Sequence, residues 1–443
     1  MLKEFLQIIS ETVWGMPTVI IIVSAGLYFT CKLKILQVLC INDMLKAVKK
    51  TAFSGDKSKL WSVATSLCAT IGTGSISGVA TALTLGGVGS IFWLWVSAFL
   101  GMAVAYAEGV LSIKYKGKKS GGIMYALKNG ANSPKIASIY AFLTVGTAFG
   151  MGSMVQTNSA ALSLDSQLGI SPWLVGGAVA LAVAACLFFK DNFTGKFCAV
   201  LLPLLSILYI AVAVWIILVN YKGILPAFKQ IFEEAFGLKP IFGGAVGFGV
   251  KKAVSVGFKR GVFSNEAGLG TTAAIHSESG CTPHEQGVLN MFEVIVDTFV
   301  VCTLTALAII CSGALKSGLD GAELVCIAGS TAFGSLAGKI IAIAIAGFAV
   351  ATALGWSKIG FSAFNYLFKE KSQAVYKILF ILSAFAGAVL SLETVWQISD
   401  IFNGLMVLPC VSALLVLRKE IIGEFYNRPV EPNPFSPRSV SGK

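Results

Sequence analysis

Apolar residues recur along this chain in long, nearly unbroken runs that short polar stretches separate. A helix that crosses a bilayer needs about 20 apolar residues, and continuous runs favour helices over the alternating pattern of a β-barrel. The pattern therefore predicts an all-α polytopic membrane protein. We expect eleven spans, at 13–30, 60–84, 88–113, 135–163, 172–189, 197–219, 243–277, 286–313, 334–367, 375–391 and 394–417.

Two of these runs are interrupted by glycines and hydroxyl residues, one in each half of the chain. The span 60–84 contains "SLCATIGTGSISG", and the span 243–277 contains "GVFSNEAGLGTT". Irregular backbone at membrane depth persists only where protein or a water-filled cavity satisfies it. Two such spans in corresponding positions point to a transport site within an inverted repeat. We therefore expect an N-terminal transmembrane helix at 1–31, one five-helix repeat at 60–219 and a second at 243–418.

Composition and charge agree with this class and give it an orientation. The chain is 56% hydrophobic and 13% charged, whereas soluble proteins carry about 25% charged residues. Alternate loops hold most of the 34 lysines and arginines, and the positive-inside rule then places the N-terminus outside and the C-terminus in the cytoplasm. The net charge of +12 is explained by topology, without nucleic-acid binding. The tail at 419–443 is expected to be cytoplasmic and largely disordered.

The sequence lacks the motifs that are typical of several functional classes. No Walker A, H-E-x-x-H or G-x-S-x-G string is present, which disfavours direct ATP coupling and an intramembrane enzyme. An ion channel is a remote alternative, although no repeated filter string occurs. The two histidines, His276 and His284, have no metal-ligand spacing, so neither a zinc or haem site nor an organic cofactor is expected.

The strings "RGVFSNEAGLG", "DTFVVCTLTAL" and "TALGWS" resemble the alanine/glycine:cation symporter family of prokaryotes, and the likeness covers about residues 12–420. The resemblance implies a leucine-transporter-like fold in the prokaryotic plasma (inner) membrane, surrounded by lipid. It also implies a secondary active symporter that imports a small neutral amino acid with Na+ by alternating access. Serine or glutamine as substrate and a proton as coupling ion stay open, and so does the oligomeric state.

An amino-acid zwitterion requires recognition of both charges. Half-helix N-termini suit a carboxylate, and free carbonyls suit an ammonium group. The first break is expected to present N–H groups, and the second, around Phe263 to Gly268, to present carbonyls beside the Phe263 ring. Ser75 stands where the family usually has asparagine and is expected to face the substrate or an ion. The candidate substrate-binding residues are Gly72, Thr73, Gly74, Ser75, Gln156, Phe263, Gly268 and Trp356.

Two of these residues have a second interpretation. By resemblance, Gln156 in "GMGSMVQTNSA" faces the site, and its amide can both donate and accept; the alternative is a hydrogen bond that only joins two helices. Trp356 in "TALGWS" would cap the side-chain pocket. The alternative for Trp356 is a packed aromatic residue without contact to substrate.

The coupling ion requires oxygen ligands at close range. In "FAVATALGWS", Phe348, Ala351 and Thr352 fall on one helical face. By resemblance, the family has hydroxyls at the last two of these positions, so Ala351 has lost one. The Thr352 hydroxyl and backbone carbonyls near Cys68 and Ile71 are the expected sodium ligands.

Burying a carboxylate within a membrane span costs free energy, so such a residue is first considered a functional candidate. Four qualify, namely Glu108, Glu266, Glu293 and Asp297. Glu266 adjoins the second break and is expected to hold backbone N–H groups or to steer a cation, whereas Glu108 is expected near the solvated interface. For Glu293 and Asp297, ion binding and a structural partnership with unwound backbone both stay open.

A polar stripe precedes the second break. Lys251, Lys252, Ser255 and Lys259 share one helical face. We interpret this face as the wall of a water-filled vestibule, with Arg260 as its gate. A stripe that is merely solvated at the surface is the alternative.

The loop charges predict the location of the C-terminus. A reporter that works only in the cytoplasm should be active when fused there, and a reporter that works only outside should be silent. Fusions after Lys222, in a loop expected outside, should give the opposite pattern. A C-terminus found outside would contradict both this topology and the inverted repeat.

Overall fold

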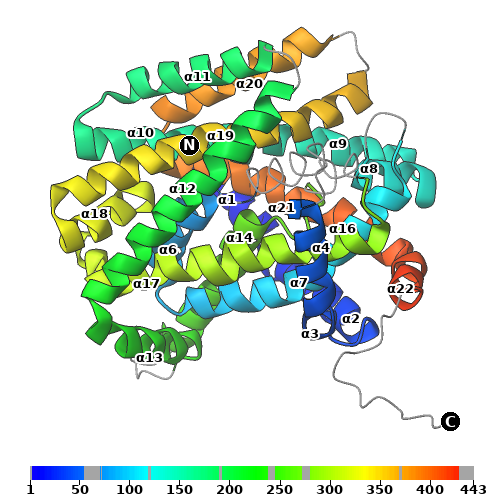
Figure 1. Cartoon of the computed structure of the whole chain (residues 1–443), viewed down its shortest axis with the longest axis horizontal. Coiled ribbons are helices and arrows are strands. Elements are labelled where there is room, and N and C mark those ends of the chain that lie inside the picture. Colours follow the sequence, from blue (N-terminus) through cyan, green and yellow to red (C-terminus); the bar gives the residue numbers. More distant parts are fainter. Residues whose placement is uncertain are drawn as a thin grey trace.

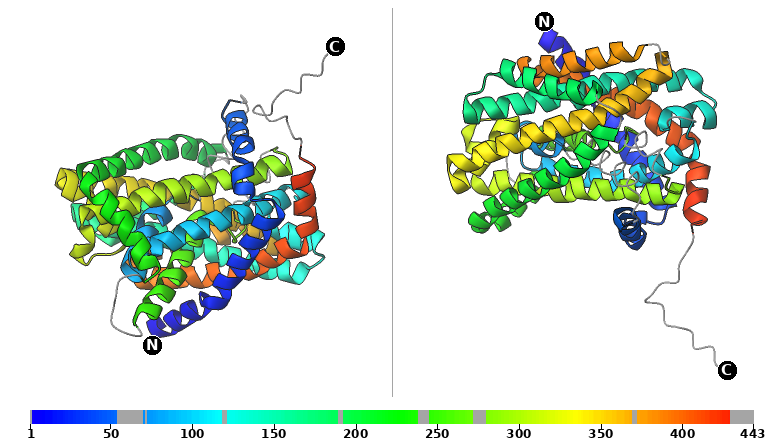
Figure 2. Two further views of the ribbon diagram at one scale, coloured as in Figure 1. Left: turned by 90° about the horizontal axis from the view of Figure 1, so that it is seen from below. Right: turned by 45° about the horizontal axis from the view of Figure 1, so that its top comes forward.

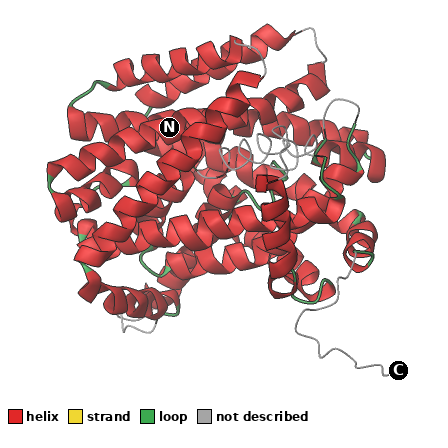
Figure 3. Cartoon of the chain, viewed as in Figure 1, coloured by secondary structure: helices red, strands yellow, loops and turns green. Residues whose placement is uncertain are grey.

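The computed structural model describes residues 2–53, 70, 72–117, 121–188, 192–237, 245–271, 280–368 and 372–428. Its regular elements are all helical, and the described residues contain no strand (Figure 3). The helices pack into one bundle, in which α11 and α20 lie side by side along one face (Figure 1). The all-α class predicted from the sequence is confirmed.

The helices up to the end of the first expected repeat are α1 (Leu2–Val13), α2 (Met16–Lys32), α3 (Leu36–Leu39), α4 (Ile41–Phe53), η1 (Gly74–Gly78), α6 (Val79–Gly86), α7 (Ser90–Lys114), α8 (Ile123–Tyr125), η2 (Ala126–Gly130), α9 (Pro134–Phe149), η3 (Gly150–Met154), α10 (Val155–Leu168), α11 (Pro172–Phe188) and α12 (Asn192–Val219). Those that follow are η4 (Tyr221–Gly223), α13 (Ile224–Ala235), α14 (Ala245–Asn265), α16 (Pro283–Val294), η5 (Ile295–Cys302), α17 (Thr303–Ser312), η6 (Ala314–Ser317), α18 (Gly321–Phe333), α19 (Ser335–Phe368), α20 (Gln373–Val389), α21 (Leu392–Val416) and α22 (Arg418–Tyr426).

The N-terminal region forms two helices where the sequence predicted one at 1–31. Trp14 and Gly15 separate α1 from α2, and Pro17 lies in the first turn of α2, where its missing N–H leaves no helical bond unmade. Both helices run along one side of the bundle, α1 against α21 and α2 against α7 and α21 (Figure 2). The interruption lets the arm bend around the core.

Helix α7 lies deep in the bundle and packs closely on α16 and α14 (Figure 1). Glycines permit the contact with α16. A Cβ added to Gly109 would lie 2.9 Å from the backbone of Gly287, and one added to Gly287 would lie 2.5 Å from the Tyr106 ring. Small residues at such crossings let helix backbones approach closely in lipid. This packing fixes the position of Glu108 on α7.

Four π-helical segments occur in the described residues, and three of them, η1, η3 and η5, contain or adjoin residues singled out from the sequence. A π turn widens a helix locally, and such turns are frequent at functional sites. Ser75 lies in η1, Gln156 follows η3, and Asp297 lies in η5. These widened turns carry polar side chains that the sequence had singled out.

The number of spans remains a prediction. Within the described residues, seven helices are long and apolar enough to cross a membrane, and four shorter apolar helices accompany them. One of the shorter helices, α18, was not among the eleven predicted segments, and neither was the amphipathic α13. Helix α22 occupies the start of the region predicted as a disordered tail. Helices α13 and α18 were missed because a membrane span was expected to need about 20 apolar residues.

Candidate functional site

The first break lies at Gly72 and Thr73, which are non-helical and buried, and η1 begins at Gly74. Two close contacts explain the glycines. A Cβ on Gly72 would lie 2.3 Å from Thr352 Oγ1, and one on Gly74 would lie 3.2 Å from the Phe263 ring. A larger residue at Gly72 would therefore collide with α19.

Gln156 lies directly beside this break. Its Oε1 accepts from Thr73 Oγ1 at 2.7 Å and from Thr73 N at 3.3 Å, while its Nε2 donates to the Met151 carbonyl at 2.9 Å. The Met151 carbonyl belongs to the widened turn η3, which presents it to the side chain. The amide thus positions Thr73, and the site-facing location implied for Gln156 agrees with this geometry.

The second break begins at Glu266, three residues later than expected, because α14 continues through Asn265. Positive φ angles at Glu266 (58°), Gly268 (96°) and Gly270 (72°) turn the chain out of the helix. Glycine adopts such angles readily, whereas a glutamate does so at a cost. Phe263 is therefore helical, and its ring packs against Trp396 at 4.5 Å between centroids.

The break also changes the hydrogen-bond acceptors of two backbone N–H groups that follow α14. Ala267 N donates to Asn265 Oδ1 at 3.1 Å, and Gly268 N donates to Glu108 Oε1 at 2.8 Å. In a continuing helix, these two N–H groups would bond to the carbonyls of Phe263 and Ser264. Both carbonyls therefore lose their usual helical donors, as the sequence predicted for this stretch.

Two buried carboxylates hold the second break in place. Glu108 binds Gly268 N and accepts from Cys410 Sγ at 3.2 Å. Glu266 accepts from Thr271 Oγ1 and from Trp356 Nε1, the latter at 3.1 Å. The expectation that Glu108 is solvated near the interface is wrong, since it is 1% exposed. The second break and Cys410 of α21 cover it, and the sequence could not reveal these contacts between distant segments.

Trp356 combines features of both of its interpretations. It is fully buried, and Gly152 lies so close that an added Cβ would be 2.4 Å from the Trp356 Cβ. Its indole N–H is bound to Glu266 rather than left free for a ligand. Trp356 therefore connects α19 to the second break, and its contact with substrate stays a prediction.

The Thr352 hydroxyl is oriented toward the first break. Thr352 is 1% exposed, and its Oγ1 has no hydrogen-bond partner within the described ranges. It faces Gly72, which follows the other predicted sodium ligands, Cys68 and Ile71, in the sequence. Cys68 and Ile71 lie outside the described residues. A buried, unpaired oxygen at this place fits a cation ligand.

The face of α14 that was predicted to line a vestibule is exposed at one end and buried at the other. Lys251 and Lys252 are exposed, and Ser255 donates to the Trp14 carbonyl at 3.1 Å. Lys259 instead lies 2.6 Å from Asp400, and Arg260 is 2% exposed. The interpretation as a wet face is therefore wrong at its inner end, because protein carboxylate replaces water there.

Arg260, Lys259 and Asp400 form a buried charge cluster between α14 and α21. Arg260 binds Asp400 through two nitrogens, at 2.9 and 3.4 Å, and its guanidinium lies 3.9 Å from the Trp396 ring centroid. Trp14 Nε1 donates to the Asp400 carbonyl at 2.8 Å. Sequence reasoning missed Asp400, although a carboxylate inside the apolar run 394–417 carries the same signal as Glu108.

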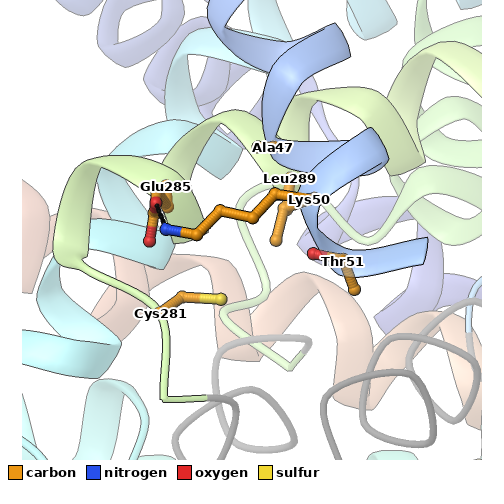
Figure 4. A pocket seen from close by; sticks show the side chains of 6 residues that line it. All are labelled: Ala47, Lys50, Thr51, Cys281, Glu285 and Leu289. Atoms are coloured by element: carbon orange, nitrogen blue, oxygen red, sulfur yellow. Dashed lines mark hydrogen bonds and ion pairs between the residues drawn. The ribbon is translucent and has the colours of Figure 1, made fainter. Parts of the chain in front are cut away.

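Two polar features lie apart from this site. The pocket in Figure 4 is lined by α4 and α16 and contains the Lys50–Glu285 ion pair at 2.5 Å. Nearby, Cys40, Asp43 and His284 place potential metal ligands within 4.8 Å of one another, across a sequence distance that hid them from spacing rules. Arg428 already supplies positive charge to this cluster, 3.5 Å from Cys40 Sγ. Burial also raises the pKa of the Cys40 thiol to about 11, which disfavours a thiolate ligand.

Comparisons with known proteins agree with this architecture. Residues 1–428 match the model of the sodium:alanine symporter family. The chain is 39% identical to the sodium/alanine symporter AgcS of Methanococcus maripaludis, over 94% of this chain and 95% of that protein. It is 31% identical to the probable sodium/glutamine symporter GlnT of Bacillus subtilis, over 95% and 89% of the two chains. The structure of MhsT in complex with L-phenylalanine has the same leucine-transporter-like fold, with a TM-score of 0.56 at 12% identity, covering 83% of this chain and 97% of that one.

The buried Asp400 cluster predicts a large loss of stability in Asp400→Asn. Removing one partner of a buried ion pair costs about 3–5 kcal/mol, because the other charge stays buried without compensation. Thermal unfolding of the purified protein, followed by tryptophan fluorescence, should show a clearly lower midpoint. Glu393→Gln, on an exposed position of the same helix, is the matched control. Equal midpoints for the two variants would contradict the assigned role of the cluster.

Proposed function

We propose that this chain, which belongs to the sodium:alanine symporter family, imports a small neutral amino acid of the alanine and glycine class together with Na+. It is a multi-pass membrane transporter and not an enzyme. In this proposal, the two expected repeats rock against each other to give alternating access, and the orientation is N-terminus outside in a prokaryotic plasma membrane.

The main support for the proposal is that the two helix breaks lie in contact with each other. Gly74 of the first break packs against Phe263 at the end of α14, so the two interruptions share one buried region. N–H groups at the start of η1 suit the substrate carboxylate. The carbonyls of Phe263 and Ser264, freed from their helical donors, suit the substrate ammonium group.

The walls of this region favour a small side chain. Phe263 is fixed between Gly74 and Trp396, and Trp356 is fixed by Gly152 and Glu266. Rings held on several sides cannot move aside cheaply for a larger substrate. This argument agrees with the name of the archaeal relative, a sodium/alanine symporter. The name of the Bacillus relative keeps glutamine as the competing substrate.

The unpaired Thr352 hydroxyl supports a sodium site beside the first break. This oxygen faces Gly72 at the first break, and a broken helix offers backbone carbonyls as ion ligands. An ion at this point would join α19 to the broken helix, and substrate would bind to the same broken helix. The binding of sodium and the binding of substrate would then be coupled, because each ligand orders the broken-helix backbone to which the other one binds.

The substrate class is tested by uptake into proteoliposomes. Alanine and glycine should accumulate when a sodium gradient is imposed, and an excess of unlabelled serine or glutamine should compete weakly. Liposomes with equal sodium on both sides are the control for the gradient, and protein-free liposomes are the control for leakage. Stronger competition by glutamine than by glycine would refute the alanine and glycine class, while accumulation without a sodium gradient would refute the coupling.

Thr352→Ala should weaken sodium activation more than it weakens substrate affinity at saturating sodium. Loss of one oxygen ligand should raise the half-activating sodium concentration roughly tenfold, since a tenfold change corresponds to about 1.4 kcal/mol. Ser362→Ala, which removes a half-buried hydroxyl from the same helix, should leave the activation curve unchanged. Superimposable curves for Thr352→Ala and wild type would place the sodium site elsewhere.

A further inference from the structure

Helix α4 has apolar residues on two different faces. Met44, Ala47 and Thr51 recur at i, i+3 and i+7 and are buried, where α4 packs against α16. Ile41 and Leu45 lie on another face at i and i+4, and their side chains are 43% and 48% exposed. An amphipathic helix that only covers a protein core has one apolar face. An apolar face of α4 therefore remains exposed after the helix has packed against the bundle.

The exposed apolar face continues onto the short helix α3, which precedes α4. Val38 and Leu39 of α3 are 61% and 51% exposed, and Ile35 in the turn before them is 52% exposed. Single exposed apolar side chains are normal at a protein surface, whereas a contiguous group of them indicates a binding surface. The exposed apolar residues of α3 and α4 form such a group.

This group lies where the chain leaves a membrane span. The candidate span that contains α2 ends at Lys32, directly before the turn that leads into α3. Helix α4 runs across the direction of the long helix α7 (Figures 1 and 2). Because α7 is itself a candidate span, α4 lies along the membrane surface rather than through the membrane. A helix in this position meets lipid headgroups and the adjoining ends of the acyl chains.

A third face of α4 is basic. Lys46 and Lys49 are exposed, and the Lys50 side chain is 63% exposed although its Nζ pairs with Glu285 at 2.5 Å (Figure 4). These lysines recur at i, i+3 and i+4, so they share one side of the helix. Leu45 and Lys49 are also one turn apart, which places the basic face next to the exposed apolar face.

The acidic residue of α4, Asp43, points away from these lysines toward other basic groups. Its Oδ2 lies 3.4 Å from His284 Nε2 and 3.9 Å from Arg428 Nε. The basic face therefore keeps its positive charge. Positive charge beside an exposed apolar strip is complementary to an anionic phospholipid, which presents a phosphate above its acyl chains.

We propose that α3 and α4 form a binding surface for anionic phospholipid, in which Lys46 and Lys49 bind the headgroup and Ile41 and Leu45 contact the acyl chains. A zwitterionic lipid offers the same acyl chains without the net negative charge, so the lysines select against it. This surface is separate from the substrate and sodium sites proposed above. The Lys50–Glu285 pair joins it to the start of α16, so bound lipid would hold α4 and α16 together at the membrane surface.

The test is the binding of phosphatidylglycerol with a fluorescent acyl chain to the purified full-length chain in micelles of a neutral detergent, measured by fluorescence anisotropy. Phosphatidylcholine with the same acyl chain is the neutral comparison. Wild type should bind phosphatidylglycerol roughly tenfold more tightly than phosphatidylcholine. Potassium chloride should reduce this preference, because salt screens charges at an exposed surface, and potassium avoids any effect of added sodium.

Two kinds of variant separate the headgroup contact from the acyl-chain contact. The pair Lys46→Gln and Lys49→Gln should weaken binding of phosphatidylglycerol roughly tenfold and leave that of phosphatidylcholine unchanged. Leu45→Gln should weaken binding of both lipids alike, since acyl-chain contact does not depend on headgroup charge. The pair Lys222→Gln and Lys316→Gln removes two exposed lysines elsewhere in the chain and should match wild type.

Three results would overturn the proposal. The first is equal affinity of wild type for the two lipids, and the second is an equal loss of phosphatidylglycerol binding in the two lysine pairs. The third concerns a second copy of the chain, the competing occupant of the apolar face. If Leu45→Gln lowers the oligomeric state in multi-angle light scattering and leaves the affinity for both lipids unchanged, that face is a contact between copies. Because the measurement is lipid binding, a failure of sodium-driven uptake would overturn the proposed function and leave this surface standing.

Discussion

Backbone polar groups inside a membrane must be satisfied by the protein itself, and the centre of this molecule is built around that constraint. Both breaks expose N–H and C=O groups that a regular helix would have paired. Side chains from distant helices take over these bonds: Gln156 holds Thr73 at the first break, and Glu108 holds Gly268 at the second. The breaks therefore depend on α10 and α7 for their shape, and these helices are part of the site although neither is broken there.

This arrangement explains why so many acidic groups are buried in a chain of basic net charge. Glu108 and Glu266 act mainly on backbone and indole N–H groups, so they serve the shape of the second break. Among the described residues, the hydrogen-bond partners of Asp297 are hydroxyl and thiol groups, and Asp400 has two basic partners. Carboxylates that look alike in the sequence thus differ in their partners, which are backbone and indole N–H groups, hydroxyl groups or basic side chains.

The sequence predicted the features that local composition controls. Glycine and hydroxyl residues within apolar runs marked both breaks, and the motif resemblance placed Gln156 beside the first of them. Features that depend on contacts between distant segments were missed. The burial of Glu108 depends on its contacts with Gly268 and Cys410, and the burial of Arg260 depends on Asp400, 140 residues away. Helices α13 and α18 were missed because their apolar lengths fall below that of a membrane span.

The N-terminal arm has a mechanical consequence. Trp14 is bonded to the Asp400 carbonyl, Ser255 to the Trp14 carbonyl, and Lys259 to Ser10, so the arm bridges α14 and α21 at the charge cluster. Any movement that separates these two helices must first break the bonds of the arm. These bonds would raise the energy barrier between the conformations of the proposed transport cycle, although the arm is part of neither proposed ligand site. In the proposed transport cycle, the turnover rate would thereby depend on a segment outside both predicted repeats.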